Sequence, residues 1–337
     1  MGALRATWMP WRLRFKFEAR TSRAVMHCKD TYFVKVWRED NPGRYGLGEC
    51  ALFRGLSRED DDAYESRLSA ACANPEGEFG DSSIRFGFET ALANLEGAFP
   101  QGRHIPIPIN GLVWMGDKEL MRSRIEQKLL EGFRCIKLKI GGIDFDDELD
   151  LLRFIRKRFP RDVLELRVDA NGAFSPEDAL AKLERLATFD LHSIEQPIAA
   201  GNHAAMARIC RESPVPVALD EELIGMTPNA LKDELLGEVR PQYIVLKPSL
   251  CGGFAESDRW IEVARRHGIG WWATSALESN IGLEAIARWL GKYDVSMPQG
   301  LGTGELYHNN VGDGVVRRGA YVELNDAATP PLLDFDR

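Results

Sequence analysis

From about residue 103 onward, short apolar runs alternate with longer stretches whose apolar residues recur at helical spacing. The runs predict strands, because they are short and rich in branched and aromatic side chains. The predicted strands are Ile105–Trp114, Ile136–Ile140, Leu164–Asp169, Ser193–Gln196, Val215–Asp220, Tyr243–Lys247, Trp271–Ser275 and Val295–Gln299. The predicted helices are Lys118–Glu131, Asp146–Arg158, Pro176–Thr188, Asn202–Glu212, Ala255–His267 and Gly282–Leu290. Eight strands alternating with helices favour a (β/α)8-type barrel. A doubly wound dinucleotide-binding sheet is the competing fold, and the lack of a G-x-G-x-x-G turn after an early strand weakens it.

The first hundred residues follow a different pattern. Apolar and polar residues alternate before residue 50, which predicts an antiparallel meander with a turn at Asp40–Gly43. The acidic run Glu59–Asp62 follows Ser57 and predicts the capped start of a helix, and a second helix is expected at Ser82–Leu95. A further strand is expected at Tyr321–Leu324, returning to this first unit. We therefore divide the chain into an α+β domain at 1–102, a barrel at 103–312 and a C-terminal segment at 313–337.

Composition narrows the class of protein. The chain has 337 residues, of which 44% are apolar and 28% charged, as in ordinary soluble globular proteins. The net charge of −8 argues against a nucleic-acid partner, and no apolar run approaches the roughly 18 residues that a membrane span needs. The N-terminus lacks the apolar core of a secretory signal. Six scattered cysteines without a C-x-x-C pair suit reduced thiols, so we expect a cytoplasmic protein.

The run Cys135–Ile140 carries two lysines, Lys137 and Lys139, at alternate positions. In a strand such residues face the same side, so the two ammonium groups would project together. Each charge would lower the pKa of the other lysine, and a lysine with a lowered pKa can act as a base near neutral pH. A K-x-K pair alone is more typical of an exposed edge strand. The residues that follow favour the catalytic interpretation.

Three acidic residues end the next three predicted strands. Asp169, Glu195 and Asp220 lie about 25 residues apart, close to one β/α unit per step, so they would meet at the carboxyl-terminal edge of the barrel. Converging carboxylates repel one another unless a hard dication neutralises them, and oxygen ligation with room for water favours Mg²⁺. Lys247 ends the following strand, across the barrel mouth from Lys139. The set predicts removal of a proton next to a carboxylate and stabilisation of the resulting enediolate.

The motifs K-x-K, V-D-A-N, E-Q-P, L-D-E and L-K-P resemble those of the enolase superfamily, in its muconate lactonizing enzyme-like subgroup. The resemblance covers nearly the whole chain, and Gly46–Cys50 with Gly55–Ser57 is similar to that subgroup's capping domain. It implies a modified TIM barrel, (β/α)7β, closed by an N-terminal α+β capping domain that the C-terminal segment completes. It implies an enzyme with Mg²⁺, or Mn²⁺ in its place, as cofactor. The implied roles are Asp169, Glu195 and Asp220 as metal ligands, Lys139 and Lys247 as the acid/base pair, and Lys137 assisting Lys139.

Three loop sequences narrow the substrate within the subgroup: 109–116, 275–282 and 299–304. Dipeptide epimerases of the subgroup carry Asp-x-Asp after strand eight to hold the substrate's amino group, whereas this chain has Gly302-Thr303-Gly304. The resemblance therefore implies a dehydratase, a lyase, acting on a small carboxylate whose second carboxylate meets the N–H groups of this loop. The candidate substrate-binding residues are Asn110, Ser275, Ser279, Gly302 and Thr303.

Other functions remain open at this point. An N-acylamino acid racemase, or another racemase or epimerase of the subgroup, would share all the catalytic residues. A barrel that binds a carboxylate without turnover belongs to a different class. A nicotinamide-dependent reductase is disfavoured, because Tyr243 and Tyr307 are poorly placed for it. The sequence predicts no membrane insertion and is compatible with a homo-oligomer, without deciding the oligomeric state.

Overall fold

The computed structural model describes residues 2–21, 24–99, 106–325 and 327–335. The predicted domain boundary at 102/103 and the predicted strand start at Ile105 lie outside the described residues. Among those described, no helix combines the length and the apolar character that crossing a bilayer requires.

An antiparallel three-stranded sheet forms the N-terminal domain, as the alternating pattern predicts. Its order is β1-β2-β3, and helices α1 and α2 pack against it. The elements are β1 (Leu4–Arg20), β2 (Val25–Arg38), β3 (Asn41–Cys50), α1 (Tyr64–Ala73) and α2 (Ser82–Glu96). The turn between β2 and β3 comes earlier than expected, because Arg38 already pairs with Asn41.

The acidic run before α1 does not form the first turn of that helix, and the prediction of a helix capped by Ser57 was wrong. The Ser57 hydroxyl instead accepts a hydrogen bond from Phe53 N at 3.0 Å. Asp60 accepts from Gly55 N at 2.7 Å, and Asp61 accepts from Ala63 N at 2.8 Å. Short acidic side chains that bind nearby backbone stabilise turns in competition with a helix, which explains why α1 begins only after them.

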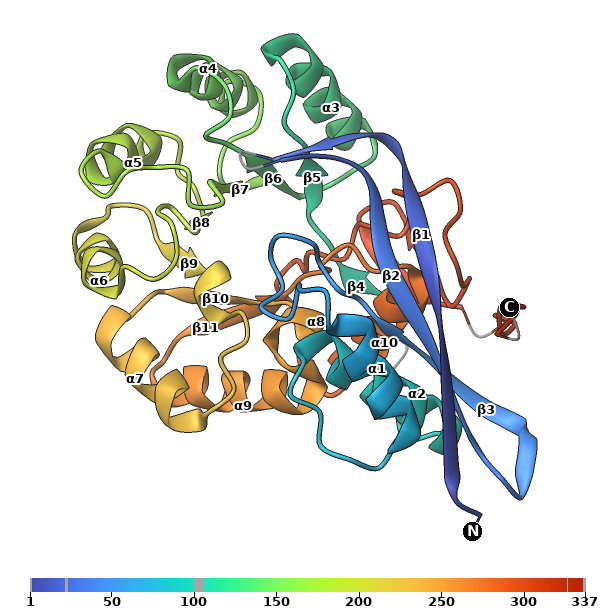
Figure 1. The fold of residues 1–337 in the computed structure, drawn as a ribbon. Coiled ribbons are helices and arrows are strands. Elements are labelled where there is room, and N and C mark those ends of the chain that lie inside the picture. The colour runs from blue at the N-terminus through green and yellow to red at the C-terminus, as the bar shows by residue number, and fades with distance from the viewer. Residues whose placement is uncertain (1, 22–23, 100–105, 326, 336–337) are drawn as a thin grey trace.

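A curled parallel sheet of seven strands, in the order β11-β10-β9-β8-β7-β6-β5, forms the barrel, and helices cover its outside (Figure 1). The strands are β5 (Gly111–Val113), β6 (Cys135–Lys139), β7 (Glu165–Asp169), β8 (Ser193–Glu195), β9 (Val217–Leu219), β10 (Tyr243–Leu246) and β11 (Gly270–Ala273). The α-helices are α3 (Lys118–Leu130), α4 (Phe145–Arg156), α5 (Ala179–Ala187), α6 (His203–Glu212), α7 (Asn229–Val239), α8 (Pro248–Cys251), α9 (Gly253–Arg266) and α10 (Asn280–Leu290), with a short 3-10 turn at Glu221–Leu223. The sequence did not predict α7 and α8.

The eighth strand position closes the barrel without forming a regular strand. Parallel bridges join Ile109 to Gln299 and Thr274 to Gly300, so the segment lies between the first and seventh strands. The predicted strand Val295–Gln299 is thus reduced to its last residue and Gly300. Pro298 in this run has no N–H to donate to a ladder, which is one reason for the reduction. The architecture is the (β/α)7β barrel with a separate antiparallel domain.

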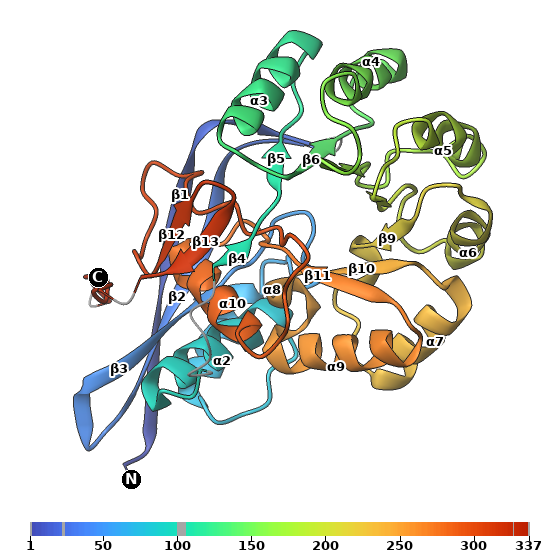
Figure 2. The same cartoon turned by 180° about the vertical axis from the view of Figure 1, so that it is seen from behind.

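The C-terminal segment makes two different contacts. Strand β13 (Tyr321–Leu324) pairs with β12 (Val315–Arg318) and with β4 (Ile107–Pro108), so it belongs to a small sheet that precedes the first barrel strand and not to the β1-β2-β3 sheet (Figure 2). Further on, Leu333 and Phe335 pack against a cluster that contains Phe33 of β2. The tail therefore contacts the N-terminal domain, and the domain limits themselves stay a prediction.

Two buried carboxylates of the N-terminal domain bind the starts of barrel helices. Glu49 of β3 accepts from Ser279 N at 2.9 Å and from Gly282 N at 3.1 Å at the start of α10. Glu89 of α2 accepts a hydrogen bond from Phe254 N at the start of α9. Free N–H groups and the helix dipole favour negative charge at these positions. These contacts fix the N-terminal domain on the barrel.

We expect Glu89 to make the protein less stable as the pH rises through neutrality. Burial raises the pKa of Glu89 to about 7, although the N–H groups of α9 oppose the shift. A folded-state pKa above the unfolded value of about 4.3 means that the folded protein binds the extra proton, so stability falls between these pH values. The wild type should lose about 2 kcal/mol of unfolding free energy between pH 5.5 and pH 8 that Glu89→Gln does not lose. Denaturant unfolding at both pH values measures this, and equal pH dependence in the two proteins would contradict it.

Candidate active site

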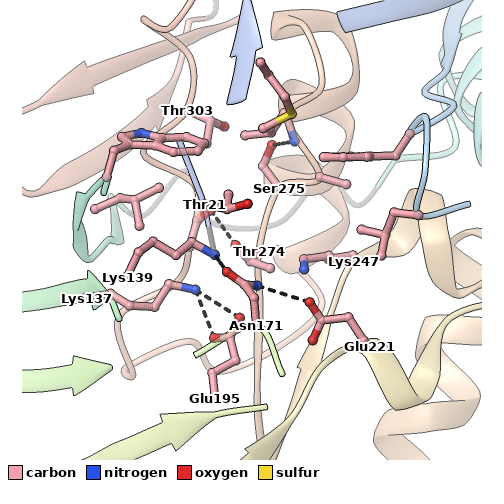
Figure 3. A pocket seen from close by; sticks show the side chains of 18 of the residues that line it. Thr21, Lys137, Lys139, Asn171, Glu195, Glu221, Lys247, Thr274, Ser275 and Thr303 are labelled. Carbon is pink, nitrogen blue, oxygen red and sulfur yellow. Dashed lines mark hydrogen bonds and ion pairs between the residues drawn. The ribbon is translucent and has the colours of Figure 1, made fainter. Parts of the chain in front are cut away.

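Six charged side chains predicted to act together meet at the carboxyl-terminal ends of five neighbouring strands. Figure 3 shows four of them, namely Lys137, Lys139, Glu195 and Lys247. Five of the six are buried, and Lys247 is half-buried, with 13% of its side chain exposed. Alternation along β6 turns Lys137 and Lys139 to the same side, as the spacing predicted. The residues and their positions are Lys137 and Lys139 on β6, Asp169 at the end of β7, Glu195 at the end of β8, Asp220 directly after β9 and Lys247 directly after β10.

Each carboxylate in this group is paired with a lysine. Lys139 Nζ lies 2.6 Å from Asp169 Oδ2. Lys137 Nζ lies 2.9 Å from Glu195 Oε2 and 3.2 Å from Asp169 Oδ2, so two acids converge on one ammonium group. Lys247 Nζ forms an ion pair with Asp220. In Figure 3, Lys139 and Lys247 reach into the cavity from opposite sides.

The pKa shifts record the mutual influence of these charges. Burial raises the pKa of Glu195 to about 8, and the charge of Asp169 adds to the shift while Lys137 opposes it. Burial would raise the pKa of Asp169 as well, but the charges of Lys139 and Lys137 outweigh it and lower that pKa. Burial lowers the pKa of Lys137, yet the charges of Glu195 and Asp169 outweigh it, so the net shift is upward. The expected lowering of the pKa of Lys137 is therefore wrong for this arrangement, because its neighbouring carboxylates act more strongly than the second lysine.

The three carboxylates fit a divalent metal ion by their chemistry. They are hard oxygen donors, buried almost completely, and they face one another closely enough for the charges of Asp169 and Asp220 to raise the pKa of Glu195. Within the described ranges, no group of three or more His, Cys, Asp or Glu side chains is arranged ready to hold a metal ion. The ion pairs above explain this, since the lysines provide the positive charge that the acids require.

A hydrogen-bond chain that the sequence did not single out extends from Lys139. Asn171 Oδ1 accepts from Lys139 Nζ at 2.8 Å, and Asn171 Nδ2 donates to Glu221 Oε1 at 3.1 Å. Asn171 adopts a left-handed backbone conformation with φ of 46°, which asparagine tolerates better than most residues. The V-D-A-N motif contains this asparagine, so its place two residues after a metal-ligand candidate was the available signal. The chain orients the Lys139 ammonium group from the side away from Lys137.

A cavity of about 340 Å³ lies above the charged group. Besides Lys137, Lys139, Glu195 and Lys247, its lining includes Asn110, Ser275, Gly302 and Thr303. Asn110 Oδ1 and Thr303 Oγ1 are buried and have no hydrogen-bond partner in the described part of the chain. Buried polar atoms are usually satisfied, so these two atoms indicate a place for a polar group of a ligand.

The N-terminal domain supplies an apolar part of the cavity lining that the sequence analysis did not predict. Met26, Phe53 and Leu56 come from this domain, and Leu112 and Trp114 come from the segment at β5. No local motif marks these residues, because their role depends on how the two domains meet. They favour a ligand with an apolar body between its polar groups.

Ser279 does not lie among the cavity-lining residues, and we do not keep it as a substrate-binding residue. Its hydroxyl accepts from Ile281 N at 3.2 Å, which caps α10, and donates to Glu49 Oε2 at 2.6 Å. The sequence analysis gave both serines as candidates because they belong to the loop 275–282, which carries part of the family resemblance. The chain turns between the two serines, so that Ser275 faces the cavity and Ser279 faces the N-terminal domain.

Comparison with known proteins agrees with this geometry. Residues 120–327 match the family model described as enolase C-terminal domain-like. An o-succinylbenzoate synthase of Desulfotalea psychrophila is 44% identical to this chain, with 89% of this chain and 93% of the relative covered. An N-succinylamino acid racemase of an Amycolatopsis species is 32% identical over 60% of this chain and 55% of its own length.

Among solved structures, the crystal structure of MenC from Desulfotalea psychrophila superimposes with a TM-score of 0.83 and 39% identity. It covers 95% of this chain and 99% of its own. The similarity therefore includes the N-terminal domain as well as the barrel.

Proposed function

The chain belongs to the enolase C-terminal domain-like family, and on that premise we propose that it is an o-succinylbenzoate synthase. The reaction is the dehydration of 2-succinyl-6-hydroxy-2,4-cyclohexadiene-1-carboxylate, a cytoplasmic step of menaquinone biosynthesis. The observation that carries this proposal is the 44% identity to such an enzyme over 93% of that enzyme's length. The paired lysines and acids support the reaction class independently, since they provide bases beside a site for a substrate carboxylate.

Lys139 is the base in this proposal. It removes the proton on the ring carbon that carries the carboxylate, and the C–H electron pair moves into the carboxylate to give an enediolate. The electrons then return to form the new ring double bond, the C–O bond at the hydroxyl carbon breaks, and the leaving hydroxide takes the proton from Lys139. Water and an aromatic ring are the products, so one lysine suffices for both proton transfers.

Lys247 stays protonated in this proposal and faces the reacting carbon from the other side. Its ion pair with Asp220 and the further charge of Glu221 raise its pKa despite burial, which keeps the ammonium group charged at neutral pH. A fixed positive charge stabilises the enediolate more than the substrate carboxylate, because the enediolate carries more negative charge, and this accelerates the reaction. Asn171 and Lys137 orient Lys139 and the acids around it.

Asp169, Glu195 and Asp220 would hold the metal ion, and hard oxygen ligation favours Mg²⁺, with Mn²⁺ as a substitute. The ion, when bound, supplies positive charge for the substrate carboxylate as negative charge develops on it. With the ion bound, the ammonium groups of the lysines would no longer be the sole positive charges that neutralise the three acids.

Asn110, Ser275, Gly302 and Thr303 are proposed to bind the substrate's second polar arm. The unpartnered buried atoms Asn110 Oδ1 and Thr303 Oγ1 support this placement. The apolar lining from Phe53, Leu56 and Trp114 suits the carbon ring and the succinyl methylenes. Purified protein with added Mg²⁺ should convert the cyclohexadiene into the aromatic product, which the ultraviolet absorbance of the ring reports. No conversion under these conditions would reject the proposal.

We expect little or no epimerisation of unblocked dipeptides. The loop after the eighth strand position has no acidic side chain among Gly302, Thr303 and Gly304, so nothing there pairs with a dipeptide's ammonium group. An N-succinylamino acid has no such group, and its racemisation is the second candidate function, favoured by the related racemase. Assaying L-Ala-L-Glu against an N-succinylamino acid in the same preparation tests this. Efficient epimerisation of the dipeptide would overturn the assignment of the substrate.

A further inference from the structure

We propose that Glu278 is a positioning residue that ties the cavity wall after β11 to the turn carrying Lys247, with buried Lys29 of the N-terminal domain as its counter-charge. Glu278 does not line the cavity and was not among the residues singled out in the sequence. The inference goes beyond the proposed function and uses that function only as one readout.

Glu278 connects two serines that belong to different parts of the site. The side chain is fully buried, and its Oε1 accepts from Ser249 Oγ at 2.5 Å while its Oε2 accepts from Ser275 Oγ at 2.6 Å. Ser249 belongs to the turn of α8, whose Leu250 N donates to the carbonyl oxygen of Lys247 at 2.8 Å. Ser275 lines the cavity. One carboxylate thus holds both the backbone that presents Lys247 and the adjoining cavity wall, which follows the neighbouring strand β11.

The wall needs such support, because its backbone is strained. Leu277 has a φ of 65°, a left-handed conformation that is unusual for a leucine. Three contacts hold it: Ser275 Oγ accepts from Leu277 N at 2.9 Å, Tyr307 Oη donates to Leu277 O at 2.8 Å, and Glu278 fixes the Ser275 hydroxyl. Loss of the carboxylate would release the first of these contacts as well, since the Ser275 hydroxyl would lose its acceptor.

Lys29 of β2 is a buried positive side chain whose charge acts on both Glu49 and Glu278. It is 6% exposed, and its Nζ has no hydrogen-bond partner among the described residues. Burial lowers the pKa of Lys29, and the charges of Glu49 and Glu278 oppose that shift. An ammonium group held in a buried place without a hydrogen bond is costly, so its retention points to a role for its charge.

Glu49 and Glu278 differ in how much they depend on that charge. Glu49 accepts three hydrogen bonds from Ser279 N, Ser279 Oγ and Gly282 N at the start of α10, where the helix dipole adds positive potential. Glu278 accepts its side-chain hydrogen bonds from two neutral hydroxyl groups. Among the described residues, the Glu278 carboxylate binds no helix terminus, so we infer that its negative charge depends more on Lys29 than the charge of Glu49 does. Lys29 lies on β2 of the N-terminal domain, and Glu278 connects it to the turn that carries Lys247. The position of the N-terminal domain on the barrel therefore contributes to the position of Lys247.

The test is a double-mutant cycle with Glu278→Gln and Lys29→Met. Glutamine keeps the size of the side chain but cannot accept from both hydroxyl groups, so Lys247 and the wall should shift. We expect kcat to fall about 10- to 100-fold with KM changed much less, since a displacement of this size affects the reacting geometry more than binding. The double variant should be less impaired than the product of the two single effects, because loss of the Lys29 charge matters less once the Glu278 charge beside it is gone.

A matched control distinguishes positioning from stability. Lys232 and Glu256 also form a fully buried lysine–glutamate ion pair, between α7 and α9, and neither lines the cavity. Lys232→Met and Glu256→Gln should lower the melting temperature while leaving kcat unchanged at temperatures where the variants are folded. The inference is overturned if folded Glu278→Gln retains wild-type kcat, or if the effects of Lys29→Met and Glu278→Gln simply multiply.

The outcome is separable from that of the proposed function. A wild type that fails to dehydrate the cyclohexadiene refutes the proposed function alone. The four proteins of the double-mutant cycle are then compared in two other measurements. One is the rate at which the α-proton of an N-succinylamino acid exchanges in D₂O, and the other is the coupling between Lys29 and Glu278 in the free energy of unfolding. Exchange slowed in Glu278→Gln but not in Glu256→Gln supports the positioning role, and equal rates in both contradict it.

Discussion

Lys139→Ala is expected to abolish turnover, with kcat lowered by about 10⁴-fold or more, the upper range for loss of a general base. The expectation follows from the position of Lys139 Nζ, 2.6 Å from Asp169 and bonded to Asn171 at the cavity floor. Fold and substrate binding should be largely preserved, because Lys137 still contacts Asp169 at 3.2 Å. Single-turnover kinetics together with the melting temperature measure the two effects separately.

Lys247→Ala provides the comparison for that result. It should retain proton removal by Lys139 and lose about 10²- to 10³-fold in rate through lost charge stabilisation. Following α-proton exchange of a non-eliminating substrate analogue in D₂O in each variant tests the assignment of the base. Exchange that survives in Lys139→Ala but disappears in Lys247→Ala would place the base on the other face.

Removal of the divalent metal ion should have the second large effect: chelation abolishes activity, and added Mg²⁺ restores it and raises the melting temperature. Three buried acids lie together beside the cavity, and burial together with the charges of Asp169 and Asp220 raises the pKa of Glu195 to about 8. An ion that binds only the folded state stabilises it, by about 2.7 kcal/mol at a concentration 100 times its Kd. Differential scanning calorimetry of chelated and Mg²⁺-loaded protein measures the shift.

Asp169→Asn is the control for the metal prediction. It removes one candidate ligand and leaves the size of the side chain, so Mg²⁺ should no longer raise the melting temperature to the same extent. If chelation of the wild type leaves both activity and melting temperature unchanged, the three acids do not form a metal site.

The charged residues of the site could be predicted from the sequence because each lies at the end of a short, strongly apolar strand. Period-two alternation puts Lys137 and Lys139 on one face, and regular β/α spacing brings Asp169, Glu195 and Asp220 to one edge. The structure brings these side chains together as expected. The local sequence pattern is sufficient to predict these residues. In a barrel, residues at the ends of successive strands lie close together in space, so regular spacing along the chain indicates proximity.

Other features depend on information that the local pattern does not contain. The run Glu59–Asp62 has helix-capping composition, yet its side chains bind loop backbone such as Gly55 N. Ser279 and Ser275 are close in sequence but face different domains, because a strained turn at Leu277 separates them. The apolar cavity residues, such as Phe53, become visible only when the N-terminal domain is placed on the barrel.

The direction of the pKa shift of Lys137 also could not be predicted from the local sequence pattern. The sequence indicated two lysines that lower each other's pKa, but Glu195 and Asp169 lie within 3.2 Å of Lys137 Nζ and raise it instead. The net shift of the pKa of Lys137 depends on the distances between charges on different strands. A bound metal ion would change that shift again, so metal binding and the base chemistry of the lysines are interdependent in this site.

The central claim, that this chain is an o-succinylbenzoate synthase, is tested most directly by comparing two substrates with one Mg²⁺-loaded preparation. The measurement is kcat/KM for dehydration of the hydroxycyclohexadiene carboxylate and for racemisation of an N-succinylamino acid. We predict efficient dehydration, with the larger kcat/KM of the two, and its loss in Lys139→Ala. Racemisation at a high rate without detectable dehydration would contradict the claim and make the protein a racemase of the same family.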